Sequence, residues 1–77
     1  MTLAELPISF AGLITGFTKQ GETLSRLHSM GVIPGAKAMV LRSAPFGDPI
    51  QVKIDGGLFS IRKQDALQIE VETIWAS

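Results

Sequence analysis

The chain has 77 residues, seven lysines and arginines balanced by seven aspartates and glutamates, and no cysteine. Its length fits one domain with one core, so residues 1–77 are expected to form a single domain. The lack of cysteine excludes disulfides and thiolate metal ligands, which suits a reducing cytosol. Zero net charge with scattered basic residues argues against a nucleic-acid partner, because phosphate backbones reward clustered positive charge.

Hydrophobic residues make up 45% of the chain. Residues 1–7 have no basic n-region and contain Glu5 and Pro7, so they are not expected to be a signal peptide. The uncharged stretch 6–18 is too short to span a bilayer. These features predict a soluble protein without direct membrane insertion, with some apolar surface left for a partner.

Residues 9–17 are predicted to form the first strand, because they are rich in Ile, Leu, Phe and Thr. Gly12 and Gly16 lie four residues apart within this segment. Glycine weakens a flat strand but permits the coiling that closes a small barrel. The first strand is therefore expected to be strongly bent.

Residues 21–30 are predicted to form the one helix. Leu24, Leu27 and Met30 recur at steps of three and give the helix an apolar stripe. A helix this short does not hold alone in water, so the stripe must dock on the sheet. Core packing is the preferred interpretation for Leu27 and Met30, which leaves Arg26, His28 and Ser29 for the outer face.

The end of this helix carries strong stop signals. Gly31 can adopt the left-handed position that follows a helix, which places Val32 against Leu27 in a Schellman ending. Pro34-Gly35 has the residues of a type II turn. The helix is therefore expected to end at about residue 30 and to turn sharply into the next strand.

Residues 37–43 are predicted to form a second strand, which residues 44–49 interrupt. This segment, A-P-F-G-D-P, has two prolines and a glycine and cannot continue a paired strand. Prolines restrict its conformations and Phe46 lies near its tip, as in a pre-ordered recognition loop. The alternative is that Phe46 folds back as a lid on the end of the barrel.

Residues 50–62 alternate between apolar and polar side chains and are predicted to form a hairpin around Asp55-Gly56-Gly57. If the two glycines form the loop, Ile54 faces Phe59. If the aspartate and the first glycine form it, Val52 faces Phe59. Both registers put the apolar residues on one face, so the alternation does not choose between them.

Residues 63–66 are expected to be a polar link with at most one helical turn, followed by a last strand at 67–72. This strand is predicted to place Gln68, Glu70 and Glu72 in water. Residues 74–77 are apolar without a pattern. Five strands and one short helix between the first two predict a mainly β fold, a small closed or nearly closed barrel.

No arrangement of catalytic residues is visible. His28 is the single histidine, and no Asp or Glu lies three or four residues away to orient its ring. Metal ligands at helical spacing from His28 are also missing, and Glu70 and Glu72 could hold a hard cation only weakly. We expect no catalytic, cofactor or dedicated metal site, and therefore no enzyme.

Two motifs identify a resemblance that covers about residues 3–72. M-G-V-I-P-G at 30–35 and A-P-F-G-D-P-I at 44–50, followed by R-K-x-x-A-x-x-I-x-V at 62–71, closely resemble the ferrous iron transport protein A family (FeoA). This family is related to the C-terminal domain of iron-dependent repressors. Residues 7–9 depart from the pattern, because family members often carry a glycine before the first strand.

The resemblance implies an SH3-like barrel in the bacterial cytoplasm, peripheral to the inner membrane through its partner. That partner is implied to be FeoB, a membrane ferrous iron transporter whose cytosolic portion includes a GTP-binding domain. The implied role is accessory, without GTP hydrolysis or iron carriage. The implied contact residues lie in the helix region and in the loop: Leu24, Leu27, Met30, Pro45, Phe46, Gly47, Asp48 and Pro49.

Two alternatives remain open. One is a metal-sensing SH3-like domain of the iron-dependent repressor type. The other is a weak homo-oligomer formed through exposed strand edges or Trp75. Recognition of proline-rich peptides is not expected despite the SH3-like fold, because the chain has no tyrosine to line such a groove.

Overall fold

The computed structural model describes residues 1–19 and 21–76. Their elements in chain order are η1 (Leu3–Glu5), β1 (Phe10–Phe17), α1 (Glu22–Ser29), β2 (Lys37–Ser43), β3 (Ile50–Ile54), β4 (Gly57–Ile61), α2 (Lys63–Ala66) and β5 (Ile69–Ala76). Mainly β structure, with one helix between the first two strands, is as the sequence predicts. The short helical segment η1 was not predicted from the sequence.

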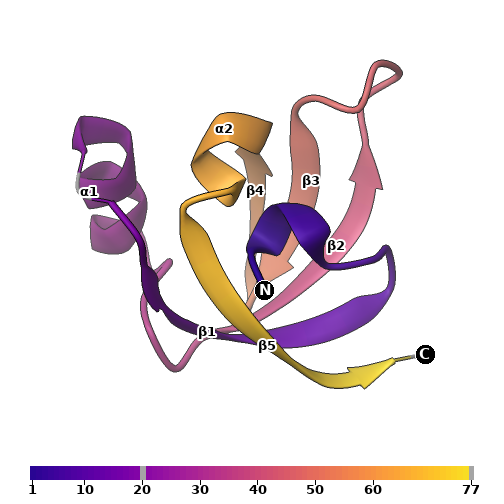
Figure 1. Ribbon diagram of the computed structural model, residues 1–77, viewed down its shortest axis with the longest axis horizontal. Helices are drawn as coiled ribbons and strands as arrows, with labels where there is room; N and C mark the ends of the chain where they lie inside the picture. The colour runs from indigo at the N-terminus through magenta and orange to yellow at the C-terminus, as the bar shows by residue number, and fades with distance from the viewer. Residues whose placement is uncertain (20, 77) are drawn as a thin grey trace.

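All five strands form one antiparallel sheet in the order β4-β3-β2-β1-β5. The sheet curls strongly, and its two edge strands, β4 and β5, are not paired with each other (Figure 1). Complete closure by hydrogen bonds, one of the two forms expected, is therefore wrong. Leu3 of η1 and Ala66 of α2 are fully buried in the core, so short helical segments supply part of its wall.

The bend of β1 lies where its glycines are. The register of β1 against β5 shifts between Ala11 and Gly12 and again between Ile14 and Gly16, as β-bulges do. A Cβ atom on Gly12 would lie 3.1 Å from Cδ2 of Leu6, whereas one on Gly16 would meet nothing within 4 Å. The predicted coiling is confirmed, and Gly12 has the additional role of admitting the N-terminal segment.

Helix α1 ends as its sequence predicts, although it is one residue shorter at each end. The amide of Val32 donates to the carbonyl of Leu27 at 3.0 Å, and the amide of Gly31 donates to His28 at 3.2 Å. Gly31 has φ 108°. This is the Schellman pattern, and it buries Val32 in the core.

The turn after α1 is also confirmed. Gly35 has φ 94°, and the amide of Ala36 donates to the carbonyl of Ile33 at 3.1 Å. The amide of Gly35 then donates to Ile14 of β1 at 2.8 Å. The helix exit is thereby hydrogen-bonded to the sheet.

The hairpin uses Asp55-Gly56 as its two-residue loop, so Val52 faces Phe59. Asp55 has φ 51°, a conformation that aspartate tolerates better than most residues. Its amide donates to the Lys37 carbonyl at 2.9 Å, and its Oδ1 accepts from the Lys37 amide at 3.2 Å. These two bonds to β2 help to select the register that alternation alone leaves open.

The last strand starts later and extends further than predicted. The amide of Leu67 donates to Lys63 at 2.9 Å, which makes residues 67 and 68 part of the α2 exit. Pairing with Phe10 and Ala11 then carries β5 to Ala76. This extension depends on a partner more than 60 residues away in sequence, which a local pattern cannot reveal.

The polar side chains at positions 68, 70 and 72, which were expected in water, are only partly exposed. Gln68 is half-buried, and its Oε1 accepts a hydrogen bond from the Thr18 hydroxyl. Glu70 is also half-buried, with Oε2 3.9 Å from the Met1 amino group. Glu72 alone of the three is exposed as expected.

The N-terminal segment completes the core. Leu3 and Leu6 are buried, and the amide of Val71 donates to the Met1 carbonyl at 2.8 Å, which attaches the segment to β5. The Thr2 amide donates to Oε1 of Glu5 at 2.7 Å and holds the pKa of that carboxyl below its ordinary value. Among the described residues every fully buried side chain is apolar, although the hydroxyl oxygen of half-buried Thr2 is shielded from solvent without a hydrogen-bond partner.

Gly12 and Gly16 of β1 provide a matched test of the close approach between Gly12 and the Leu6 side chain. Gly12→Ala is expected to lower the free energy of unfolding by about 1–2 kcal/mol, because its methyl group would meet the Leu6 side chain. Gly16→Ala is expected to change it by less than about 0.5 kcal/mol. Urea denaturation measures both, and equal costs would contradict a steric role specific to residue 12.

The left-handed helix end gives a second prediction. Gly31→Ala is expected to cost about 1 kcal/mol of stability, since a Cβ atom at φ 108° is strained even in open space. Gly31→Asn should cost less, because asparagine adopts positive φ more readily. The measurement is the urea midpoint, and an alanine variant as stable as the parent protein would argue against a strained cap.

The candidate binding loop and its surroundings

The loop 44–49, between β2 and β3, is held by its own backbone. The Gly47 amide donates to the Ala44 carbonyl at 2.7 Å, which closes a turn with Pro45 and Phe46 at its two central positions. The Ala44 amide donates to Pro49 at 2.9 Å and closes the base of the loop. Pro45 restricts one of the two central residues, and Gly47 supplies φ 84°. The loop therefore has little conformational freedom to lose on binding.

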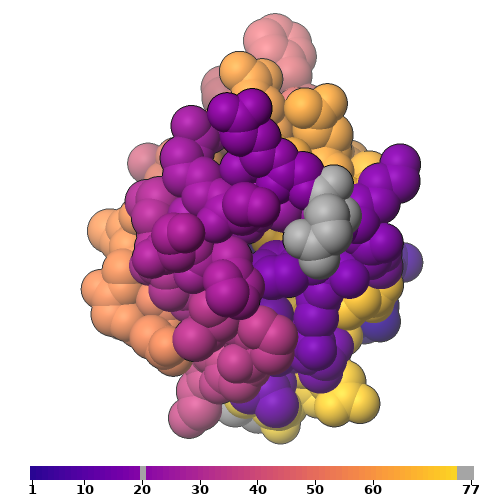
Figure 2. Space-filling model, turned by 90° about the vertical axis from the view of Figure 1, so that its left-hand side faces the viewer, coloured from indigo at the N-terminus to yellow at the C-terminus, as the bar shows by residue number. Residues whose placement is uncertain are grey.

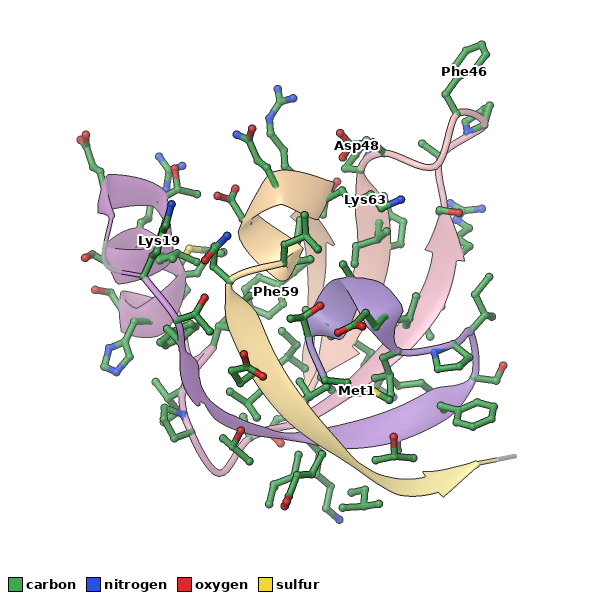
Figure 3. The ribbon with its side chains drawn as sticks, in the orientation of Figure 1. Met1, Lys19, Phe46, Asp48, Phe59 and Lys63 are labelled. Carbon is green, nitrogen blue, oxygen red and sulfur yellow. The ribbon has the colours of Figure 1, made fainter. Side chains whose placement is uncertain are left out.

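Phe46 projects from the tip of this loop. Its side chain is 99% exposed and points away from the body of the molecule (Figure 3). The alternative in which it folds back as a lid is therefore wrong. The turn between Ala44 and Gly47 directs Phe46 outward, and no strand continues beyond it to supply a packing surface.

Asp48 connects the loop to α2. Its Oδ1 accepts a hydrogen bond of 2.9 Å from the backbone amide of Lys63, the first residue of that helix. First-turn amides lack a partner within their own helix, so a carboxylate from elsewhere can satisfy one of them. This contact could not be predicted from the sequence, because 15 residues separate its partners and an aspartate is common in turns without such a contact.

The residues proposed from the helix region divide into two groups. Leu24 and Leu27 are buried in the core, whereas Met30 is 57% exposed at the C-cap of α1. Core packing is thus confirmed for Leu27 and is wrong for Met30, because the helix ends at Met30 and Val32 supplies the next buried side chain. Of the three, only Met30 is exposed to a partner.

The structure does not bring α1 and the loop together. Helix α1 lies at one side of the molecule, and the loop projects at the far end of β2 and β3 (Figure 1). Within the loop, Pro45, Phe46 and Asp48 are exposed, while Gly47 and Pro49 are half-buried. The proposed contact residues therefore form two separate surfaces, with the exposed aromatic ring on the loop.

An open groove of about 400 Å³ lies beside α1, on the face turned to the viewer in Figure 2. The rings of Phe17 and His28 meet edge to face there, with their centroids 6.0 Å apart. Arg26, His28 and Ser29 are exposed, as predicted for the outer face. The Ser29 hydroxyl donates to the Ser25 carbonyl at 3.0 Å, so it is engaged within the helix.

Metal-ligating side chains do not cluster within residues 1–19 and 21–76. These residues contain no group of three or more His, Cys, Asp or Glu side chains that could hold a metal ion. No helix of the described chain is long and apolar enough to cross a membrane. The side chain of Trp75, considered above for self-association, lies outside the description.

Known proteins with the same architecture were found by sequence and by structure. The model of the FeoA domain family matches residues 1–73. The solved FeoA protein of Chlorobium tepidum is 36% identical, with a TM-score of 0.90 over 96% of this chain and 70% of that one. The zinc-complexed FeoA of Stenotrophomonas maltophilia, described as a procaryotic SH3 domain protein, is 24% identical, with a TM-score of 0.80 over 94% of this chain and 89% of that one.

A relative from Porphyromonas gingivalis is a fusion of Fe(2+) transport protein A with the Fe(2+) transporter FeoB. It is 34% identical over 74 residues, which are 96% of this chain but only 9% of the relative's length. The resemblance read from the two motifs is thus confirmed, together with the SH3-like fold that it implies. The chain belongs to the FeoA family, a family of ferrous iron transport.

Proposed function

We propose that this chain is a non-enzymatic accessory protein of ferrous iron uptake that binds the cytosolic G-domain region of FeoB. It acts in the cytoplasm, at the inner membrane, through that partner. The observation that carries the proposal is the relative in which an FeoA segment and FeoB are one polypeptide. Covalent linkage keeps two modules at a high effective concentration, which is useful when the modules contact each other.

The loop supports this proposal as the docking element. Its turn is closed by a backbone hydrogen bond of 2.7 Å, and its tip carries a phenyl ring that is 99% exposed. Few interface residues carry most of the binding free energy, and buried aromatic side chains are frequent among them. A pre-ordered loop also loses little entropy when it binds.

The metal-sensing alternative has less support. A sensor needs a ligand set, and no such cluster occurs among the described residues. His28 is exposed, with its ring against Phe17. Nothing in its surroundings therefore favours a metal ion over solvent.

Removal of the ring tests the docking element. Phe46→Ala is expected to weaken binding to full-length FeoB roughly 10- to 100-fold, because the apolar area that enters the interface is lost. The stability of the chain should not change, since the ring contributes nothing to the core. Surface plasmon resonance with FeoB in nanodiscs of neutral lipid measures the affinity.

Leu58→Ala is the matched control, because Leu58 is 73% exposed but lies on β4, outside the loop. Its affinity for FeoB should equal that of the parent protein. The proposed function would be refuted if the parent protein did not bind FeoB and a deletion strain took up ferrous iron normally. Equal weakening by the two variants would instead contradict the role of the loop.

The contact between Asp48 and α2 gives a second test. Asp48→Ala removes the acceptor for the Lys63 amide and is expected to lower the free energy of unfolding by about 1 kcal/mol. Affinity for FeoB should also fall several-fold, because the base of the loop is no longer tied to the helix. Asp48→Asn keeps an acceptor oxygen and should lose less in both measurements. An alanine variant with unchanged affinity would show that this bond does not position Phe46.

A further inference from the structure

Strand register and one hydrogen bond place three basic residues, from two separate parts of the chain, next to the base of the Phe46 loop. Arg42 pairs with Gln51, next to the first residue of β3. Arg62 follows Ile61, which pairs with Ile50, the residue directly after the loop. Lys63 donates its backbone amide to the loop through the hydrogen bond to Asp48. We call Arg42, Arg62 and Lys63 the basic collar.

The collar is available to a partner. All three of its side chains are exposed, and the one ion pair among residues 1–19 and 21–76 joins Met1 to Glu70. Asp48 is the acidic residue of the loop itself, and one of its oxygens already accepts the Lys63 amide. Asp65 shares a groove with Arg62 on the side facing α1. None of the three basic side chains therefore has a carboxylate within ion-pair distance among the described residues, and Arg42 lies beside Ala44 and Pro45 of the loop.

Acidic side chains are concentrated elsewhere in the fold. Glu70 and Glu72 belong to β5, and Glu5 belongs to η1, which packs beside β5. Asp55 occupies the hairpin turn at the opposite end of β3 from the loop. The chain is neutral in total, but near the loop the three basic residues of the collar outnumber the two acidic residues, Asp48 and Asp65.

An exposed aromatic ring at the tip of a loop whose base carries basic residues has the composition of an interface centre with a polar rim. An anionic membrane would also attract such a loop, but three basic residues are fewer than the clusters that bind anionic lipid surfaces. One phenyl ring adds little apolar area, so membrane binding by this loop would be marginal. A protein surface with a matching pocket fits the loop better.

We infer that the site which receives this loop on FeoB is an apolar pocket bordered by carboxylates. Phe46 fills the pocket, and Arg42 and Lys63 face the acidic border. This inference rests on the proposed function and adds the chemistry of the partner surface. Complementary charge at a rim acts mainly on the association rate, whereas the buried ring governs dissociation.

Charge-reversal variants, measured over a range of ionic strengths, separate the effect of the basic collar on association from the effect of Phe46 on dissociation. The parent chain and its variants are passed over full-length FeoB in nanodiscs of neutral lipid, at ionic strengths from about 0.05 M to about 0.5 M. Arg42→Glu is expected to reduce the association rate constant about 3- to 10-fold at the lowest salt, with little change in dissociation. Lys63→Gln should give a smaller reduction of the same kind. At the highest salt the variants and the parent chain should converge.

Lys53→Glu is the matched control, because Lys53 is an exposed lysine on β3, paired with Leu58 away from the loop. Its association rate should stay within about twofold of the parent value at every salt concentration. Circular dichroism spectra that match the parent spectrum establish that the charge variants are folded. Phe46→Ala should show the complementary behaviour, with faster dissociation and an unchanged salt dependence.

The possible outcomes distinguish the acidic border inferred for the FeoB site from the proposed function itself. Binding of the parent chain that is insensitive to salt and to Arg42→Glu overturns the acidic border but leaves the proposed function standing. No binding to FeoB at any salt concentration overturns both. Equal binding to empty nanodiscs of anionic lipid, lost in Arg42→Glu and Phe46→Ala, overturns the protein pocket and assigns the loop to a membrane surface.

Discussion

Strand β1 is hydrogen-bonded to β2 on one side and to β5 on the other, and its register against β5 shifts twice within eight residues. These shifts curl the sheet around an apolar interior that β1 alone could not enclose. At Gly12 the absence of a side chain lets Leu6 approach, and the N-terminal segment then covers part of the core. The remaining elements depend on this curvature, because α1, α2 and η1 pack only where the curled sheet leaves space.

A core of this kind leaves function to the surface. Every buried side chain in the described part of the chain is apolar, and no group of three or more His, Cys, Asp or Glu side chains there could hold a metal ion. The loop between β2 and β3 carries Phe46, which at 99% is more exposed than the other large apolar side chains of the described residues. It keeps a large apolar ring in water, and it is stiffened by its own turn and by the bond from Asp48 to α2. An ordered loop that presents an apolar ring without using it in the core is typical of a binding element.

The charged residues next to the loop add a second feature to it. The balance of seven basic and seven acidic residues suggests an electrostatically featureless protein. Strand pairing nevertheless brings Arg42 and Arg62 to the level of the loop, while Glu70 and Glu72 stay on β5. The ring and the collar therefore have complementary uses. In the proposed complex the ring contributes buried area, and the cations influence how often and in which orientation the partners meet.

The sequence by itself determined the features whose causes are local. Gly31 specifies the left-handed helix end, and the proline-rich loop must interrupt the second strand, because backbone conformation at these points depends on neighbouring residues. The family motifs are equally local. The tertiary structure decided the hairpin register through Lys37, the length of β5, the exposure of Phe46 and the bond between Asp48 and α2. Each of these depends on contacts between residues far apart in the chain, and the pattern of any one segment does not contain the position of its partner.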